Sequence, residues 1–223
     1  MDFIKLSGII SLIIQVVTGI IDYYVLSLTV PSEYLLVNQM LIMEFVVQII
    51  EGSFYVWMVY KFSQIKNITP FRYFDWMITT PTMLITLMLY LVFIRNREKG
   101  IVSESFLTEL KKRWIPITQV AILDWLMLIA GYMGEIGTIN QMTANIAGFI
   151  PFFMMFYIIY KNFVSDSIQG QKIFWYFASI WAIYGVAAFM PYNIKNIMFN
   201  ILDLFAKNFF GLFLAYTLFK VKI

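Results

Sequence analysis

Several ionisable residues lie within long apolar stretches of this sequence, where charged groups are costly and therefore rare. Lys207 follows Asp203 after four residues, a spacing that places both side chains on one face of a helix. A structural ion pair between them is one interpretation, but an isolated buried pair seldom stabilises a protein more than apolar residues would. An amine deep in an apolar environment is also a nucleophile that condenses with an aldehyde. We therefore predict that Lys207 forms a Schiff base.

The composition places these residues in a membrane protein. Of 223 residues, 61% are hydrophobic and 13% are charged, and the mean hydropathy is +0.78. A soluble domain carries charge on about a quarter of its residues. The absence of cysteine and histidine from the sequence excludes disulfides, thiolate catalysis and histidine-based triads. The net charge of +3, without a basic stripe or binding motif, argues against a nucleic-acid partner.

Seven apolar stretches are long enough to cross a bilayer, which takes roughly 20 residues. Each should be a helix, because only a helix satisfies its own backbone in lipid. The sequence thus predicts an all-α bundle of seven transmembrane helices in one domain, 1–223. The predicted spans are Phe3–Leu28, Tyr34–Tyr60, Phe71–Ile94, Trp114–Met133, Ile139–Tyr160, Ile173–Pro191 and Ile197–Phe219.

The distribution of Lys and Arg predicts the orientation of these spans. Ten of these residues lie in the loops after the third and fifth spans and at the C-terminus, against five on the other side. Because cytoplasmic loops carry the excess of positive charge, we expect the N-terminus outside and the C-terminus in the cytoplasm.

Two motifs carry a resemblance to a known family. The third span reads Arg72-Tyr73-Phe74-Asp75-Trp76-Met77-Ile78-Thr79-Thr80-Pro81, and the seventh contains Asp203-Leu204-Phe205-Ala206-Lys207. These segments resemble the R-Y-x-D-W-x-x-T-T-P and D-x-x-A-K patterns of the microbial (type 1) rhodopsins, in the same order and the same spans. In the sixth span Trp181 and Tyr184 match the W-x-x-Y pattern. Gly185 and Ala188 replace a proline and a tryptophan, which predicts a looser pocket on that side.

The resemblance implies a cofactor and roles for the residues around it. Lys207 would hold all-trans retinal as a protonated Schiff base, with Asp75 as primary counterion and proton acceptor. Asp203 would be a second counterion, Arg72 would balance the negative charge, and Thr79 would hydrogen-bond Asp75. Asp124 would lie near the ring end of retinal or make an interhelical hydrogen bond. The retinal contacts implied are Trp76, Thr80, Met83, Trp181 and Tyr184, with Phe152 and Phe156 as either contacts or ordinary packing.

Polar residues in the first, second and seventh spans predict a path for ions. Glu44, Gln48 and Glu51 fall on one stripe of the second span. Acidic linings suit cation pathways, although polar groups also join membrane helices by hydrogen bonds. The predicted pathway comprises Ser11, Glu44, Gln48, Glu51, Asn200 and Asn208. We expect Glu44→Gln and Glu51→Gln to change conduction while leaving the colour nearly unchanged.

A channel is favoured over a pump by one substitution. Related proton pumps carry an acidic donor eleven positions after Asp75, where this sequence has Thr86. The pattern is most similar to the first group of rhodopsins encoded by giant algal viruses, which implies a light-gated channel for monovalent cations (Na⁺ and K⁺) that calcium suppresses. The alternatives are an outward light-driven proton pump and a photosensor that signals through a partner; an enzyme is disfavoured. The expected partners are retinal, the lipid bilayer, monovalent cations, protons and calcium. Such a protein would reside in a host-cell membrane if virus-encoded. A homo-oligomer is also compatible with the sequence.

Overall fold

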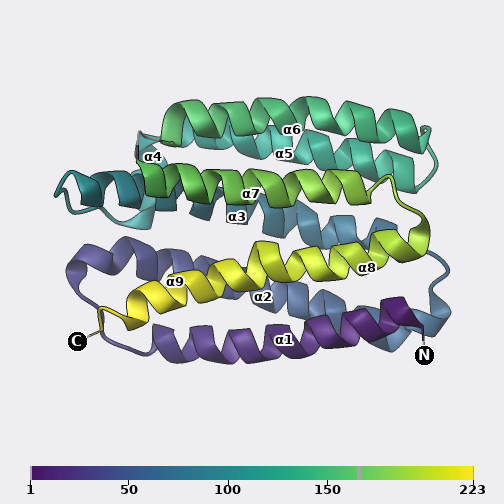
Figure 1. The fold of residues 1–223 in the computed structure, drawn as a ribbon, viewed down its shortest axis with the longest axis horizontal. Coiled ribbons are helices and arrows are strands. Elements are labelled where there is room, and N and C mark those ends of the chain that lie inside the picture. Colours follow the sequence, from purple (N-terminus) through teal and green to yellow (C-terminus); the bar gives the residue numbers. More distant parts are fainter. Residues whose placement is uncertain (1, 165–166, 223) are drawn as a thin grey trace.

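The computed structural model describes residues 2–164 and 167–222, and the helices in them run nearly side by side along one long axis (Figure 1). The N-terminus and the C-terminus lie at opposite ends of the bundle (Figure 1), as an odd number of crossings requires. The elements are α1 (Phe3–Leu26), η1 (Ser32–Tyr34), α2 (Leu35–Lys61), η2 (Phe62–Gln64), α3 (Thr69–Glu98), α4 (Phe106–Lys112), α5 (Trp114–Glu135), α6 (Gln141–Phe163), α7 (Ile168–Ala187), α8 (Tyr192–Asp203), η3 (Leu204–Asn208) and α9 (Phe209–Phe219).

Seven spans make up the bundle, as predicted. Six of them are long and apolar enough to cross a membrane by length and composition, and α8, η3 and α9 together form one of these six, over 28 residues. The remaining span is α7, whose 20 residues reach about 30 Å at 1.5 Å per residue. Polar residues in its first turns, Gln169, Gln171 and Lys172, dilute its apolar character.

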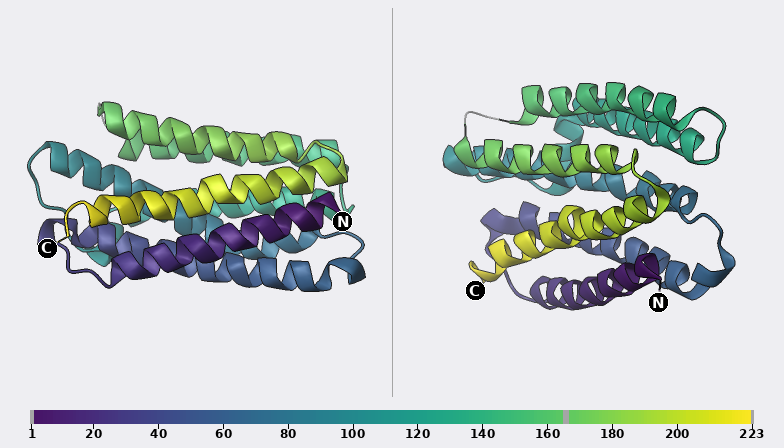
Figure 2. Two further views of the ribbon diagram at one scale, coloured as in Figure 1. Left: turned by 60° about the horizontal axis from the view of Figure 1, so that its bottom comes forward. Right: turned by 45° about the vertical axis from the view of Figure 1, so that its right-hand side comes forward.

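Helix α3 is the centre of the bundle. In its apolar 18-residue stretch 78% of the residues are buried, against 22% in that of α5. α5 and α6 lie together on one side of α3, whereas α1, α2 and the span α8–η3–α9 lie on the other (Figures 1 and 2). The arrangement leaves two internal regions beside α3, one facing α5, α6 and α7 and the other facing α1, α2 and α9.

The structure corrects two predicted starts by five residues and adds one element, and it also ends α3 at Glu98 instead of Ile94 and α7 at Ala187 instead of Pro191. α7 begins at Ile168 instead of Ile173, because the Ser167 hydroxyl caps it by accepting a hydrogen bond from the Gly170 N–H at 3.0 Å. The seventh span begins at Tyr192 instead of Ile197, directly after Pro191, a residue that suits a helix start. The short helix α4 lies in the loop after α3, where no helix was predicted.

Candidate functional site

Lys207 lies deep in the bundle, and its amine faces three carboxyl groups from three helices. Its side chain is 2% exposed. Nζ donates a hydrogen bond to Asp75 Oδ2 of α3 at 2.8 Å, and it lies 3.6 Å from Asp203 Oδ1. Glu51 Oε1 of α2 is 3.5 Å away. The predicted pair of carboxylates is therefore a group of three, and Glu51 belongs to this site as well as to the predicted pathway.

The backbone around Lys207 departs from an α-helix. Leu204–Asn208 forms a π-helical turn, in which the Phe209 N–H donates to the Leu204 carbonyl five residues earlier. From α7, the Tyr176 hydroxyl donates to the Phe205 carbonyl at 2.9 Å. A π turn widens the helix locally and is frequent at functional sites. Here it occurs at the residue that carries the amine.

Arg72 and its partners close the site on the side of the N-terminus. The guanidinium is fully buried and lies 3.6 Å from Asp203 Oδ2. It donates to the side-chain oxygens of Asn196 at 3.1 Å and Asn200 at 2.5 Å. Tyr55 of α2 donates its hydroxyl to Asp203 Oδ2 at 2.7 Å. The role of Arg72 as a balancing charge is thus compatible with the geometry.

The predicted hydrogen bond from Thr79 to the Asp75 carboxyl is not formed. The Thr79 hydroxyl donates instead to the backbone carbonyl of Asp75 at 3.0 Å, as threonines inside helices commonly do. Asp75 Oδ1 has no hydrogen-bond partner among the described residues. Asp75 Oδ1 can therefore accept a further hydrogen bond.

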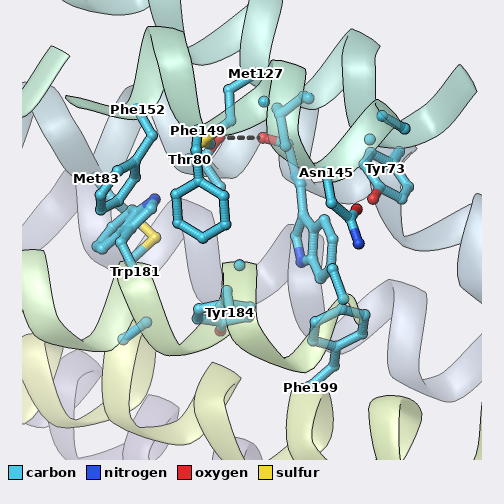
Figure 3. A pocket seen from close by; sticks show the side chains of 18 of the residues that line it. Tyr73, Thr80, Met83, Met127, Asn145, Phe149, Phe152, Trp181, Tyr184 and Phe199 are labelled. Carbon is cyan, nitrogen blue, oxygen red and sulfur yellow. Dashed lines mark hydrogen bonds between the residues drawn. The ribbon is translucent and has the colours of Figure 1, made fainter. Parts of the chain in front are cut away.

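An apolar cavity extends from Lys207 between α3, α5, α6 and α7. Most predicted contacts line it: Trp76, Thr80, Met83, Phe152, Trp181 and Tyr184. Figure 3 shows Met83, Phe152 and Trp181 on one side of it and Tyr73 and Asn145 on the other. Phe156 does not line the cavity; its ring lies against Phe152, with centroids 4.9 Å apart. Sequence reasoning missed these lining residues: Tyr73, Met127, Leu128, Gly131, Ala144, Asn145, Gly148, Phe149, Phe199 and Ala206.

The side of the cavity predicted to be loose is filled from another helix. Gly185 and Ala188 both line it, as expected of small residues at these positions. However, a Cβ at Gly185 would lie 2.5 Å from the ring of Phe149, so that ring occupies the space that the glycine leaves. The sequence could not show this, because Phe149 belongs to α6 and no spacing rule links it to α7.

Asp124 makes an interhelical hydrogen bond, which is one of the two roles that the sequence suggests for it. It is fully buried in α5, and its Oδ2 accepts from the Thr80 hydroxyl at 2.6 Å. Thr80 lines the cavity, whereas Asp124 is not among the lining residues. The Asp124 carboxyl thus holds the Thr80 side chain in place from outside the cavity lining.

The six residues of the predicted ion pathway are all buried where α1, α2 and the seventh span meet. The Ser11 hydroxyl donates to the Asn200 carbonyl at 3.2 Å, and Asn208 Nδ2 donates to the Thr18 hydroxyl at 3.0 Å. Glu44 accepts a hydrogen bond from the Thr86 hydroxyl of α3. Some residues of the pathway thus join helices, as the alternative interpretation held, yet several of their oxygens have no partner in the part of the chain that the structure describes: Glu44 Oε2, Gln48 Oε1 and Asn208 Oδ1.

Comparison with known proteins identifies the family. The family model for bacteriorhodopsin-like proteins matches residues 3–221. The chain belongs to the bacteriorhodopsin-like family. Members of this family bind retinal and act as ion pumps, channels and sensors. The resemblance to microbial rhodopsins is therefore confirmed, as is an integral, multi-pass membrane protein.

Individual relatives of this rhodopsin are distant. A green-light absorbing proteorhodopsin of Gamma-proteobacterium EBAC31A08 is 27% identical over an alignment of 161 residues that covers 65% of this chain and 59% of that protein. This match thus spans less than two thirds of the curated relative. Among solved structures, viral rhodopsin OLPVRII has 26% identity and a TM-score of 0.85, with 99% of both chains covered. A blue light-absorbing proteorhodopsin from Med12 has 22% identity and a TM-score of 0.75, with 98% of both chains covered.

The cavity fits the retinal of this rhodopsin family. It is lined by aromatic and apolar side chains, and Lys207 is among its lining residues. Trp76 of α3 and Trp181 of α7 are both nearly buried there. A flat conjugated chain would pack between such rings, and the three carboxyl groups at the amine would balance a positive charge on it.

Proposed function

We propose that this rhodopsin is a light-gated channel for monovalent cations, with retinal attached to Lys207 as a protonated Schiff base. The observation that carries the proposal is the set of buried polar side chains between α1, α2 and the seventh span. Buried polar groups are normally hydrogen-bonded. Here Glu44, Gln48 and Asn208 each keep an oxygen without a partner among the described residues, which suits a path that takes up water and cations.

The residues around Lys207 would hold and balance the chromophore. Retinal, when bound, supplies a light-driven change of shape at the amine. Asp75, at 2.8 Å, would balance the positive charge and accept its proton. Tyr55 and Tyr184 each donate to Asp203 at 2.7 Å, which fixes that carboxyl in place. Asp75 has no such pair of donors and can therefore change its proton with less rearrangement than Asp203.

Glu44 is the group best placed to control conduction. It is 1% exposed, and its single hydrogen bond in the described part of the chain comes from Thr86. A carboxylate at this depth lowers the barrier for a cation that has lost part of its water shell. Movement of α3 against α2 would break the contact with Thr86 and turn the carboxyl toward the path.

The decisive experiment is the photocurrent recorded against voltage in cells that express the protein with retinal. A channel current reverses sign at a potential set by the cation gradients, whereas a pump current keeps its direction. Glu44→Gln should reduce the current or change its cation preference and leave the visible band nearly unchanged. Glu109→Gln is the matched control, because this buried glutamate lies in α4 and pairs with Arg113. An outward current that never reverses would refute the channel.

The predicted behaviour of Glu51→Gln changes with the structure. Because Glu51 lies 3.5 Å from Lys207, its neutralisation removes a charge next to the amine. We therefore expect Glu51→Gln to shift the visible band in addition to altering the current. An unchanged colour would require Glu51 to lie away from the amine, and the 3.5 Å distance contradicts this.

The second candidate is an outward proton pump, and the contact between Glu44 and Thr86 favours it. Thr86 occupies the position where related pumps carry an acidic donor, and α2 brings the Glu44 carboxyl to this point. Glu44 would then return a proton to the amine after Asp75 had accepted one. In that case Glu44→Gln would slow recovery of the dark state, and added azide or another small weak acid would restore it.

A further inference from the structure

Asp22 lies fully buried near the C-terminal end of α1, and the site and pathway described so far do not use it. Its Oδ2 accepts a hydrogen bond from Gln48 Nε2 of α2 at 2.7 Å. Gly211 of α9 faces this pair: a Cβ at Gly211 would lie 2.7 Å from Asp22 Oδ2 and 2.9 Å from Gln48 Nε2. Three helices therefore meet at a carboxyl–amide pair that Gly211 approaches so closely that a side chain there would displace one of the two groups.

The polar atoms left over at this point are all oxygens. Asp22 Oδ1, Gln48 Oε1 and Glu44 Oε2 have no hydrogen-bond partner within residues 2–164 and 167–222. Their side chains are at least 95% buried. Glu44 lies one turn before Gln48 on the same face of α2. A buried acceptor without a donor is costly, so these oxygens favour a proton on a carboxyl group, a water molecule or a coordinated cation.

The two carboxyl groups of the cluster also have no cationic partner among the described residues. Lys207 is paired with Asp75, Glu51 and Asp203, and Arg72 with Asp203. Asp22 and Glu44 take part in none of the ion pairs found in the described residues. A buried carboxylate requires either a proton or a counter-charge. Oxygen ligands from carboxyl and amide groups suit hard cations.

We propose that Asp22, Gln48 and Glu44 form a binding site for a partly dehydrated monovalent cation. Asp22 lies near the C-terminal end of α1 and Gly211 lies in α9, and both segments run toward the end of the bundle that carries the C-terminus (Figure 1). Gly211 packs beside the hydrogen-bonded atoms of this site, Asp22 Oδ2 and Gln48 Nε2. This inference rests on the proposed channel, since it adds a binding step to the same path. Gly211 is four residues from Lys207 in the chain, so a shift of the π turn moves this glycine directly.

Infrared spectroscopy in the dark tests the binding without any current. Purified protein with retinal is compared in sodium chloride and in N-methylglucamine chloride, whose organic cation is too large for the site. Sodium should convert a protonated carboxyl band into a carboxylate band in the parent, and Asp22→Asn should lose most of this change. Glu109→Gln should keep it. Identical spectra of the parent in the two salts would mean that water alone fills the cluster, and the inference would be wrong.

Photocurrents with sodium on one side and potassium on the other test the role in conduction. Gly211→Ala places a methyl group against Asp22 and should lower the current by at least about threefold and shift the reversal potential. Asp22→Asn should also shift the reversal potential. Gly170→Ala is the matched control, because its Cβ would meet nothing closer than 3.5 Å. All of these variants should keep the visible band, which reports an intact fold.

The outcomes separate the inference from the proposed function. A parent current that reverses, together with variants that behave like the parent, overturns the cation site and leaves the channel intact. A parent current that never reverses overturns the channel, and the infrared comparison then decides alone whether the site binds a cation.

Discussion

Lys207 interacts with more negative groups than the sequence motifs indicate. Asp75 and Asp203 were found because one lies in the third-span motif and the other lies four residues before the lysine. Glu51 and Tyr55 give no such signal, because only the packing of α2 against α3 and α8 brings them to the site. Two cations, Lys207 and Arg72, thus lie among three carboxyl groups.

The amine of Lys207 is the first residue to test. Lys207→Ala removes the nucleophile and should abolish the visible band that forms when all-trans retinal is added to the purified protein. Tyr176→Phe is a useful control, because it removes the hydrogen bond to the same π turn and keeps the amine. A full band in the alanine variant would refute the Schiff-base assignment.

Asp75 and Glu51 can be ranked by a matched pair of variants. Asp75→Asn removes a negative charge at 2.8 Å from the amine and Glu51→Gln one at 3.5 Å. Loss of the negative charge disfavours the protonated Schiff base, so the pH at which the visible band disappears should fall, by about 1–3 pH units for Asp75→Asn. At a pH where the Schiff base is still protonated, the band should shift to the red. An absorption titration measures this, and a larger effect of Glu51→Gln would make Glu51 the main counterion.

At the scale of elements, the number and order of the spans could be predicted, whereas their ends and neighbours could not. Apolar stretches of about 20 residues define seven crossings irrespective of their partners. The start of α7 was missed because polar residues in its first turns resemble a loop, although Ser167 caps the helix. The approach of Phe149 to Gly185 depends on how α6 packs against α7. The hydrophobic periodicity of either helix alone does not predict this packing.

This contact between α6 and α7 yields a prediction. Gly185→Ala places a methyl group 2.5 Å from the Phe149 ring and should force the ring into the cavity, which shifts the visible band. Overpacking costs about 1–3 kcal/mol, more than the roughly 1 kcal/mol that alanine gains in helix propensity. Gly148→Ala, also in the cavity wall, meets nothing closer than 3.6 Å and should retain band and thermal stability. Equal effects of both variants would show that Phe149 does not fill this space.

At the scale of the whole molecule, the polar and apolar residues are arranged oppositely to those of a soluble protein. Large apolar side chains are exposed along the outer helices, among them Ile13, Ile20, Ile150 and Phe153. Charged and amide side chains occupy the interior beside α3. The exterior therefore suits lipid chains, and the composition of the sequence was sufficient to predict this.

The orientation in the membrane is a prediction at this scale. Ten of the 16 Lys and Arg residues lie in the last turn of α3, between α3 and α5, near the facing ends of α6 and α7, and at the C-terminus. We expect these segments in the cytoplasm, because positive loops are retained there. An epitope tag after Ile223 should bind antibody only after the cells are permeabilised, and a tag before Met1 should bind on intact cells. The reverse pattern would contradict the charge rule for this chain.

The π turn at Lys207 is a point where the seventh span can bend. An α-helix transmits a push along its axis because every turn is held by its own regular hydrogen bonds. At Leu204–Asn208 that series is interrupted, and a neighbouring helix supplies a bond through Tyr176. A displacement that starts at the lysine therefore need not move both halves equally. We expect α8, anchored through Asn196 and Asn200 to Arg72, to remain in place while α9 swings, and backbone amides after Asn208 to exchange hydrogen faster than those of α8 under illumination.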